Sequence, residues 1–341
     1  MNIHMNLGIN SYDIKIERGI IKCASRELNL NRKVFIITDD GVPEEYSQCI
    51  ASQCRESFIE TVAQGEDSKS IAVFEQLLKK MLNAGFTRSD CVVAVGGGVV
   101  GDLSGFVASA YMRGIDFYNI PTTVLSQIDS SIGGKVAVNL GGVKNIVGAF
   151  YQPKKVLVDP DVLKTLPQRQ ISNGLAEALK MATTFDEKLF RIFESSDPLD
   201  RIDDIICSSL EIKKNVVEKD EKESGLRKVL NFGHTIGHAI ESDMNLSGLY
   251  HGECVALGMI PMCSDDVRKR IVPILEKLKL PTKASFSKES VMEVITHDKK
   301  VKNGYVTAIY SDKIGSFVMK DIPCSDLGDS LDIILERGET N

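Results

Sequence analysis

Two histidines lie four residues apart in LNFGHTIGHAIE, residues 230–241, of a chain that has only five histidines. A helix would place His234 and His238 on one face, because residues four apart are neighbours on a helix surface. His251 follows later, and Glu177 supplies a carboxylate in the segment NGLAEALK. Imidazoles with one carboxylate are the ligand types of a catalytic Zn²⁺ that keeps one coordination position open. The residue types predict a metal site, although a lone histidine pair at this spacing is as often structural. Such a site needs three protein ligands, and the spacing does not show which three of the four candidates bind the metal.

A glycine cluster supplies a second chemical feature. The segment DCVVAVGGGVVGD, residues 90–102, is an apolar strand pattern that ends in Gly96, Gly97 and Gly98. Such a turn lets a phosphate approach the backbone, but it lacks the G-x-G-x-x-G spacing, and a plain tight turn would use the same residues. Asp39 ends an earlier strand pattern and is the residue type that binds a ribose hydroxyl, while strand-end aspartates also form turns. Together these features favour a dinucleotide site.

Cations and glycines also gather between residues 111 and 150. Arg113, Lys135, Lys144 and Asn145 occur there in an apolar, glycine-rich context. Backbone N–H groups and cationic side chains can converge on a phosphate in such a segment. A solvated loop with incidental lysines is the alternative, and the apolar context favours the anion site.

The elements around these residues predict an architecture of two domains. Residues 33–40 have a buried-strand pattern, residues 70–86 a helical period with a glycine stop, and residues 90–102 a second strand pattern. This alternation predicts a parallel sheet with helices on both faces and ligands at the carboxyl ends of its strands. Later segments have helical patterns. We therefore expect a Rossmann-like α/β dinucleotide-binding domain over residues 1–165 and an all-α metal- and substrate-binding domain over residues 166–341.

The composition excludes several classes of protein. A length of 341 residues exceeds what one hydrophobic core usually serves, and 43% hydrophobic with 26% charged residues is typical of a globular protein. A net charge of -6 argues against nucleic-acid binding. The eight cysteines contain no C-x-x-C pair, and no run approaches the roughly 18 apolar residues of a membrane span. The N-terminus has no signal-peptide pattern, so we expect a cytoplasmic protein with reduced thiols, no membrane partner and no nucleic acid.

An ordered set of motifs resembles the 3-dehydroquinate synthase family of sugar phosphate cyclases over most of the chain. The set comprises GGGVVGDLSGFVASAYMRG, PTTVLSQIDSSIGGK, KNIVGAFYQP, DEKESGLRKVLNFGHTIGHAIE, HGECVALGM and DKKVKNG, in the family's order. The resemblance implies conversion of 3-deoxy-D-arabino-heptulosonate 7-phosphate to 3-dehydroquinate and phosphate, with NAD⁺ and a divalent metal, Zn²⁺ or Co²⁺. NAD⁺ would take a hydride from the substrate, and it would return it after phosphate elimination and before an intramolecular aldol closure. The resemblance also implies a homodimer.

The family pattern implies a role for each matching residue. It assigns the metal to Glu177, His234 and His251, and it leaves His238 to meet the substrate. Catalytic roles fall to His238, to Glu223 as a general acid or base, and to Lys180 and Asp129 at the ring hydroxyls. The phosphate would be bound by Lys135, Asn145, Asn231, His238 and, from a second subunit, Arg113, and the carboxylate by Arg227, Lys213 and Lys299 or Lys300. NAD⁺ would be bound by Asp39, Glu66, Lys69, Gly97, Gly98, Asp102, Thr122, Thr123 and Lys144.

Two departures from the family pattern fall in one segment. Val136 and Ala137 stand where the family commonly has threonine and glycine, and Val143 stands where glycine commonly precedes the lysine. The segment also lacks the usual proline-containing turn. Because Lys135 and Lys144 themselves are present, we expect ligand binding to survive.

Three other interpretations remain open. A sister cyclase that makes inosose or valiolone rings would share the fold, the metal and NAD, although YMRG, GLR and GHTIGHA resemble the dehydroquinate type. An NAD-dependent polyol dehydrogenase would have a substrate that does not require so many cations. A nucleotide-binding regulatory or structural protein would have a closed four-ligand metal site without an exchangeable water.

Overall fold

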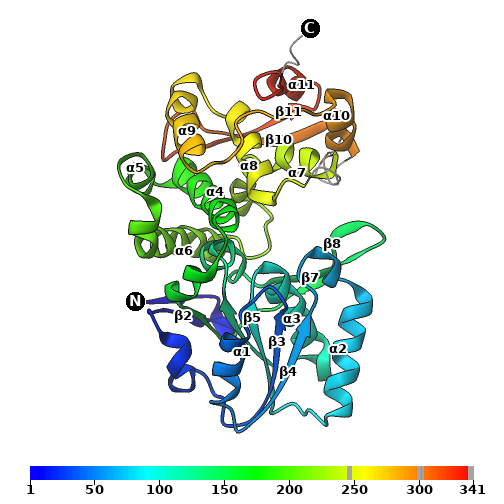
Figure 1. Cartoon of the computed structure of the whole chain (residues 1–341). Helices are drawn as coiled ribbons and strands as arrows, with labels where there is room; N and C mark the ends of the chain where they lie inside the picture. Colours follow the sequence, from blue (N-terminus) through cyan, green and yellow to red (C-terminus); the bar gives the residue numbers. More distant parts are fainter. Residues whose placement is uncertain (244–247, 298–300, 302, 337–341) are drawn as a thin grey trace. The chain divides into compact units, whose positions relative to one another are not determined.

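The computed structural model describes residues 1–243, 248–297, 301 and 303–336, and the chain forms two compact units (Figure 1). Unit 1 consists of Met1–Pro167 together with Lys213–Lys222. Unit 2 consists of Gln168–Ile212 together with the residues from Glu223 onwards. The metal candidates described below belong to unit 2, and the nucleotide candidates belong to unit 1.

A seven-stranded sheet forms the centre of unit 1. Its order is β1-β2-β9-β6-β5-β3-β4, and neighbouring strands are parallel except for the antiparallel pair β1 and β2. The strands are β1 Asn2–Met5, β2 Tyr12–Ile16, β3 Lys33–Asp39, β4 Glu56–Val62, β5 Cys91–Gly96, β6 Asp116–Pro121 and β9 Lys155–Val158. Successive strands from β3 to β6 are connected by α1 Glu44–Ala51, α2 Ile71–Asn83 and α3 Gly98–Ala110. The expected α/β class is confirmed.

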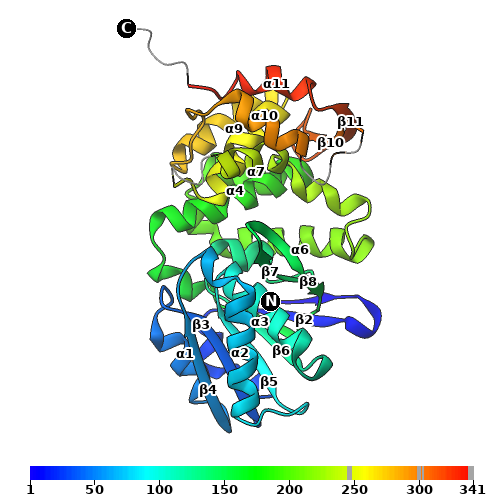
Figure 2. The same cartoon turned by 90° about the vertical axis from the view of Figure 1, so that its right-hand side faces the viewer.

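The sheet is buried on both faces because its central strands are apolar at almost every position. On β3, Val34 and Ile36 pack with α1 in one core cluster, whereas Phe35 and Ile37 pack with α2 and α3 in the other. Side chains alternate sides along a strand, so a continuous apolar run covers both faces. Figure 2 shows α2 and α3 side by side over the sheet.

The strand order changes direction between β3 and β5. The chain passes from β3 to β4 at one edge and then returns to β5 on the other side of β3, before it continues to β6. In open parallel sheets, ligands bind outside the carboxyl ends of the strands at such a switch point. Asp39 ends β3 and Gly96 ends β5, while Gly97 is the N-cap of α3, which begins at Gly98. The topology therefore brings Asp39 and the glycine turn, the two features that favour a dinucleotide, together at the carboxyl ends of β3 and β5.

A hairpin forms over the segment that contains Val136, Ala137 and Val143. Strands β7 (Lys135–Leu140) and β8 (Val143–Phe150) pair in an antiparallel two-stranded sheet. The two residues between them, Gly141 and Gly142, have φ values of +59° and +79°. Left-handed backbone at both central residues is the conformation of the tight hairpin turn that matches strand twist, and glycine adopts it without strain. Two glycines thus make the connection between β7 and β8.

Val136 packs this hairpin against α3. Val136 is buried, and a Cβ added to Gly105 of α3 would lie 2.3 Å from Cγ1 of Val136. The valine therefore fills the space over a helix position that has no side chain. Val138, two positions further on the same face, belongs to the core cluster with α3. The apolar face of β7 fixes the hairpin against unit 1.

Unit 2 is mainly helical. Its helices are α4 Gln168–Phe185, α5 Glu187–Ser195, the first part of α6 Ile202–Lys219, α7 His234–Asp243, α8 His251–Met259, α9 Asp265–Lys277, α10 Lys288–His297 and α11 Asp326–Leu331. Helix α4 is buried at every position from Ile171 to Thr184. The unit also contains an antiparallel pair, β10 Tyr305–Tyr310 and β11 Val318–Pro323, that the helical patterns did not predict. Within the described ranges, no helix is long and apolar enough to cross a membrane.

Candidate metal and nucleotide sites

Three helices of unit 2 bring the four candidate metal ligands together. Helix α4 carries Glu177, α7 carries His234 and His238, and α8 begins at His251. One ring nitrogen from each of the three histidines lies within 4.8 Å of those of the other two. The Oε1 atom of Glu177 lies 3.5 Å from Nε2 of His234 and 3.5 Å from Nε2 of His251. Helical spacing accounts for the first histidine pair, and packing between helices adds the other two side chains.

The distances between these atoms fit a tetrahedral metal ion. Ligand atoms that lie about 2.1 Å from Zn²⁺ are roughly 3.4 Å from one another at a tetrahedral angle, and the two Oε1–Nε2 distances are 3.5 Å. The Glu177 side chain is only 1% exposed. Among the residues that the structure describes, none donates a hydrogen bond to its Oε1 atom. A buried carboxylate oxygen in this state is well suited to bind a cation, so the donor set fits a metal.

The charges around Glu177 keep its carboxylate ionised. Lys180, three residues further along α4, pairs with Oε2 of Glu177 and donates a hydrogen bond of 2.5 Å to the carbonyl of Leu230. Burial alone would raise the pKa of Glu177, but Lys180 and His251 outweigh it and lower that pKa to about 2. Burial would likewise lower the pKa of His251, but Glu177 and Glu241 raise it to about 9. A metal that binds here would displace the proton of His251.

The outer ring nitrogens of two histidines have their own partners. Nδ1 of His234 lies 3.1 Å from the carbonyl oxygen of Phe232, and Nδ1 of His251 lies 3.1 Å from Oε2 of Glu241. Such contacts orient the ring and favour the tautomer that ligates through Nε2, and they are typical around metal-bound histidines. Glu241 is not among the site residues predicted from the sequence. It follows His238 by three positions and His234 by seven, so the periodicity of α7 could have identified it.

Glycines hold the ligand-bearing helices at short distances. A Cβ on Gly258 of α8 would lie 2.0 Å from the carbonyl oxygen of Gly233, which precedes α7. A Cβ on Gly252 would lie 2.0 Å from the carbonyl oxygen of Asn173 on α4, and the backbone N–H of Gly252 donates a 2.6 Å hydrogen bond to Oδ1 of Asn173. Contact between backbones leaves little freedom for α8 to move relative to α4 and α7. The relative positions of Glu177 and the histidines are therefore set by the packing.

Other candidates in unit 2 lie before α7. Arg227 is 2% exposed and belongs to the 3-10 turn Leu226–Asn231. Nδ2 of Asn231 donates a 2.7 Å hydrogen bond to Oε1 of Glu223, whose φ of +59° lies in the left-handed region. Lys299 and Lys300 lie outside the described residues.

Two candidates of unit 1 form a largely buried ion pair. Nζ of Lys213 contacts Oδ1 of Asp129 and donates a 2.8 Å hydrogen bond to its backbone carbonyl. Lys213 is 6% exposed. Asp129 lies in the π-helical turn Ser126–Ser130, a conformation found often at functional sites. The sequence analysis assigned these side chains to different groups of the substrate, and the structure places them in direct contact.

The four anion-binding candidates of unit 1 are exposed. Lys135, Lys144 and Asn145 lie on the β7–β8 hairpin, and Arg113 follows α3 in a short 3-10 turn. Asn145 has a φ of +55° and Arg113 a φ of +67°. Left-handed backbone at residues other than glycine is uncommon and concentrates at functional positions.

Asp39, Gly97 and Gly98 lie at the switch point of the sheet. Asp39 is 8% exposed, and burial raises the pKa of its carboxyl although a backbone N–H two residues on donates a 2.9 Å hydrogen bond to Oδ1. A Cβ on Gly97 would lie 3.1 Å from Cγ2 of Thr123. The N–H of Thr122 donates a 2.9 Å hydrogen bond to the last carbonyl of β5. A glycine at such a turn allows the backbone to come close to a phosphate.

A charged group lies beside this turn. Nζ of Lys69, which is 5% exposed, lies 2.5 Å from Oδ2 of Asp102 and 3.9 Å from Oε1 of Glu66. Burial raises the pKa of the Asp102 carboxyl, and the charge of Lys69 opposes that rise. Glu66 also accepts a 2.8 Å hydrogen bond from Nδ2 of Asn139. Asn139 is a second residue that the sequence analysis missed, and the sequence gives only a weak signal for it, a polar residue in an apolar strand.

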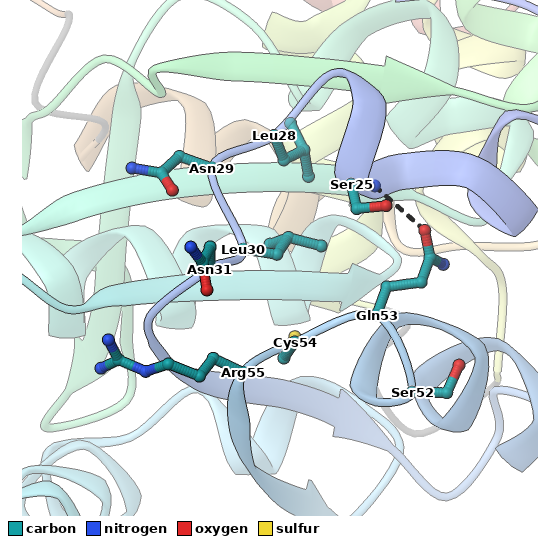
Figure 3. A pocket seen from close by; sticks show the side chains of 9 residues that line it. All are labelled: Ser25, Leu28, Asn29, Leu30, Asn31, Ser52, Gln53, Cys54 and Arg55. Atoms are coloured by element: carbon teal, nitrogen blue, oxygen red, sulfur yellow. Dashed lines mark hydrogen bonds between the residues drawn. The ribbon is translucent and has the colours of Figure 1, made fainter.

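A separate cavity of about 430 Å³ lies at the opposite end of the sheet (Figure 3). It is lined by the residues that precede β3 and β4 and by Ser25, whose backbone N–H donates a 3.0 Å hydrogen bond to Gln53. None of the candidate site residues lines it. Because ligands of parallel sheets bind at the carboxyl ends of the strands, this cavity is not the nucleotide site.

Comparisons with known sequences identify one family. The family model for the N-terminal part of 3-dehydroquinate synthase matches residues 59–173, and the model for its C-terminal part matches residues 174–301. The 3-dehydroquinate synthase of Enterococcus faecalis (strain ATCC 700802 / V583) is 41% identical over an alignment that covers 96% of this chain and 97% of that protein.

Comparisons with solved structures agree in fold. A 2-deoxy-scyllo-inosose synthase complexed with carbaglucose-6-phosphate, NAD⁺ and Co²⁺ is 23% identical, with a TM-score of 0.87 over 97% of this chain and 99% of that one. The 2-epi-5-epi-valiolone synthase of Streptomyces hygroscopicus subsp. jinggangensis, with NAD⁺ and Zn²⁺ bound, is 24% identical, with a TM-score of 0.85 over 95% and 96% of the two chains. At these identities the similarity establishes the two-domain fold alone.

Proposed function

The chain belongs to the 3-dehydroquinate synthase family, and on that premise we propose that it converts 3-deoxy-D-arabino-heptulosonate 7-phosphate into 3-dehydroquinate and phosphate. This step belongs to the shikimate pathway of aromatic amino acid biosynthesis. The observation that carries the proposal is 41% identity over 96% of the chain. The arrangement of Glu177, His234 and His251 at metal-ligand distances supports it independently of sequence identity.

We propose that Glu177, His234 and His251 hold a divalent cation, Zn²⁺ or Co²⁺. When bound, the ion would polarise hydroxyl oxygens of the substrate and make them more acidic. Lys180 keeps Glu177 ionised in its buried position. His238, whose ring nitrogen lies within 4.8 Å of those of the other two histidines, would meet the substrate. The cations in the two related cyclases, Co²⁺ and Zn²⁺, support this choice of metal.

We propose that NAD⁺ binds at the switch point of the sheet. The residues that would hold it are Asp39, Glu66, Lys69, Gly97, Gly98, Asp102, Thr122, Thr123 and Lys144. Bound NAD⁺ would accept a hydride from the substrate and later return it, so that the cofactor is not consumed. Asp39 ends β3, where a carboxylate can accept hydrogen bonds from ribose hydroxyls. Both related cyclases carry NAD⁺.

The remaining polar residues would bind the two charged ends of the substrate. Arg227, Lys213 and Lys299 or Lys300 would hold the carboxylate, and Lys135, Asn145, Asn231, His238 and Arg113 would hold the phosphate. Arg227 is 2% exposed, and a carboxylate contact gains strength where water is excluded. Glu223, hydrogen-bonded to Asn231, would act as a general acid or base, and Asp129 with Lys180 would contact the ring hydroxyls.

We further propose a cytoplasmic homodimer. The β7–β8 hairpin exposes four large apolar side chains, Leu140, Val143, Ile146 and Phe150, each between 44% and 54% exposed. Several exposed apolar residues on one element are typical of a surface that another protein covers. Met112, 42% exposed, adjoins Arg113, which would enter the phosphate site of the partner subunit. A sedimentation measurement on the purified protein tests the dimer.

Product identification tests the reaction. The purified chain is incubated with the heptulosonate phosphate, a catalytic amount of NAD⁺ and Zn²⁺, and the products are identified by mass spectrometry with a phosphate assay. We expect many equivalents of 3-dehydroquinate and phosphate for each NAD⁺, with no net NADH. One NADH for each product would instead indicate a polyol dehydrogenase, and cyclisation of a hexose phosphate in preference would indicate a sister cyclase.

A further inference from the structure

Asn139, near the end of β7, lies between residues of two proposed binding sites. Its Nδ2 donates a 2.8 Å hydrogen bond to Oε1 of Glu66, which would line the NAD site. Its Oδ1 accepts a 2.8 Å hydrogen bond from the backbone N–H of Asn145, which would bind the phosphate. One amide group thus connects a nucleotide residue with a phosphate residue, and all three residues belong to unit 1.

The chemistry of the partners fixes the orientation of this amide. A carboxylate only accepts hydrogen bonds and a backbone N–H only donates them. The amide of Asn139 must therefore direct its nitrogen to Glu66 and its oxygen to Asn145, and a flipped amide would lose both contacts. A displacement of Glu66 therefore changes the hydrogen bond to Asn145, and a displacement of Asn145 changes the one to Glu66.

The backbone of Asn139 strengthens the connection. Its N–H donates a 2.7 Å hydrogen bond to the carbonyl of Lys69, and Ser70 and Asn139 form an isolated parallel bridge. Lys69 itself pairs with Asp102 at 2.5 Å. The segment that carries the proposed nucleotide residues is therefore joined to the hairpin at Asn139 by both backbone and side chain.

The hydrogen bond from Asn145 to Asn139 also stabilises the backbone conformation of Asn145. Asn145 has a φ of +55°, a region that costs free energy for residues other than glycine and persists where surrounding contacts hold it. The hydrogen bond from its N–H to Asn139 is such a contact. If Glu66 or Lys69 is fixed by a bound nucleotide, Asn139 is fixed as well, and Asn145 is held in its left-handed conformation.

We infer that Asn139 is a positioning residue that couples nucleotide binding to phosphate binding in unit 1; the inference rests on the proposed function. Each ligand then raises the affinity for the other, because coupling between two sites is reciprocal. Asn139 contacts neither ligand in this scheme and acts through Glu66 and Asn145. The expected coupling is about 5-fold or more, the lower end of the usual range for linked sites.

Calorimetry on the zinc-loaded full chain tests the inference. The dissociation constant of NAD⁺ is measured alone and with a saturating phosphonate analogue of the heptulosonate phosphate, and the reverse titration is made with NAD⁺ present. Asn139→Leu removes both hydrogen bonds at similar volume. We expect the ratio of the two NAD⁺ constants to fall from about 5 or more to below about 2, with the same fall in the reverse titration.

A second variant and a matched control separate positioning from folding. Asn139→Asp keeps an acceptor for Asn145 but places a carboxylate against Glu66, so it should lose the coupling as well. Asn83, an exposed asparagine at the end of α2, provides Asn83→Leu and Asn83→Asp, which should retain it. Circular dichroism checks the fold of each variant. Should Asn139→Leu misfold, Asn139→Asp alone decides the result.

Two outcomes are distinguishable as failures. A parent protein that binds both ligands with no coupling, or variants of Asn139 that keep the parent's coupling, overturn the role of Asn139 and leave the proposed function intact. A parent protein that binds neither NAD⁺ nor the phosphonate overturns the proposed function and this inference with it.

Discussion

Unit 2 builds its candidate site from the sides of buried helices, whereas unit 1 builds its candidate site from turns that follow strands. The metal candidates Glu177, His234 and His238 lie on α4 and α7, and their backbones need no special conformation. In unit 1, by contrast, Asn145 has left-handed backbone and Gly97 lies where an added Cβ is crowded. Side-chain chemistry therefore decides the site of unit 2, and backbone geometry decides the site of unit 1.

The largest effect that this comparison predicts comes from the metal ligands. Glu177→Ala, His234→Ala and His251→Ala should each lose bound zinc and more than about 100-fold in turnover, which exceeds the usual cost of changing an outer-shell partner. His238→Ala should keep the metal, because His238 is assigned to the substrate and not to the metal. Metal analysis of the four purified variants checks this. Zinc loss from His238→Ala together with retention in His234→Ala would overturn the assignment.

The second prediction concerns backbone geometry in unit 1. Gly97 has a φ of -76°, which alanine adopts without strain, so Gly97→Ala should fold. Its new methyl would lie 3.1 Å from Cγ2 of Thr123, between two residues proposed to line the nucleotide. We expect NAD⁺ affinity to fall by about 100-fold, the cost of a displacement near 1 Å at a positioned ligand, with zinc content unchanged.

A matched substitution checks that the effect belongs to this position. Gly328 lies inside α11, and outside its own helix the nearest described atom to a Cβ added there is Cε of Lys288, at 3.9 Å. Gly328→Ala should therefore leave NAD⁺ binding unchanged and raise stability slightly. Calorimetric NAD⁺ titrations of both variants measure the difference. Equal NAD⁺ affinity in Gly97→Ala and the parent would show that the backbone at this turn does not limit nucleotide binding.

The same contrast explains what the sequence predicts and what it leaves out. His234 and His238 are predictable because helical spacing puts them on one face before any tertiary structure is known. The sheet is predictable because buried parallel strands are continuous apolar runs, as in β3 and β5. The pairing of Lys213 with Asp129 is not, since it depends on which unit the second half of α6 joins, and no local pattern encodes that choice.

The hairpin shows a second limit of local patterns. The glycine-rich segment around Lys144 suggested an anion-binding loop, and the structure adds that Gly141 and Gly142 form a tight turn between two strands. The proposed role of Asn139 cannot be predicted from the sequence, because it depends on two hydrogen bonds formed only in the folded chain, to Glu66 and Asn145. Residues that act through other residues have no motif of their own.

The third prediction extends the comparison to the surroundings of the metal. Glu241→Gln should retain folding but lower zinc affinity by about 10- to 100-fold, because the neutral amide orients and polarises His251 less well than the carboxylate 3.1 Å from its Nδ1. Competition with a chromophoric chelator measures the affinity without any substrate. Glu293→Gln, an exposed position on α10, is the matched control. Zinc affinity of Glu241→Gln equal to that of the control would exclude an outer-shell role.

The smallest effect is expected at a clamp on the surface of unit 2. Arg169, near the start of α4, makes two hydrogen bonds to Glu253, Nε to Oε1 at 2.7 Å and Nη2 to Oε2 at 2.8 Å. Its guanidinium carbon also lies 4.0 Å from the centre of the Tyr250 ring. Oε2 of Glu253 accepts a 2.7 Å hydrogen bond from the N–H of Tyr250. The clamp thus joins α4 to the first turn of α8, which carries His251.

Loss of this clamp should cost little because half of it faces solvent. The Arg169 side chain is 49% exposed, and exposed ion pairs with one aromatic contact contribute about 1 kcal/mol. Urea unfolding of Arg169→Met, Glu253→Gln and the double variant should give a coupling energy of that size. Zinc affinity should change by less than about tenfold, below the effect expected at Glu241, because the glycine contacts of α8 remain. If Arg169→Met instead weakens zinc binding as strongly as Glu241→Gln, the position of His251 depends on an exposed ion pair, and the buried helices of unit 2 do not fix its site by packing alone.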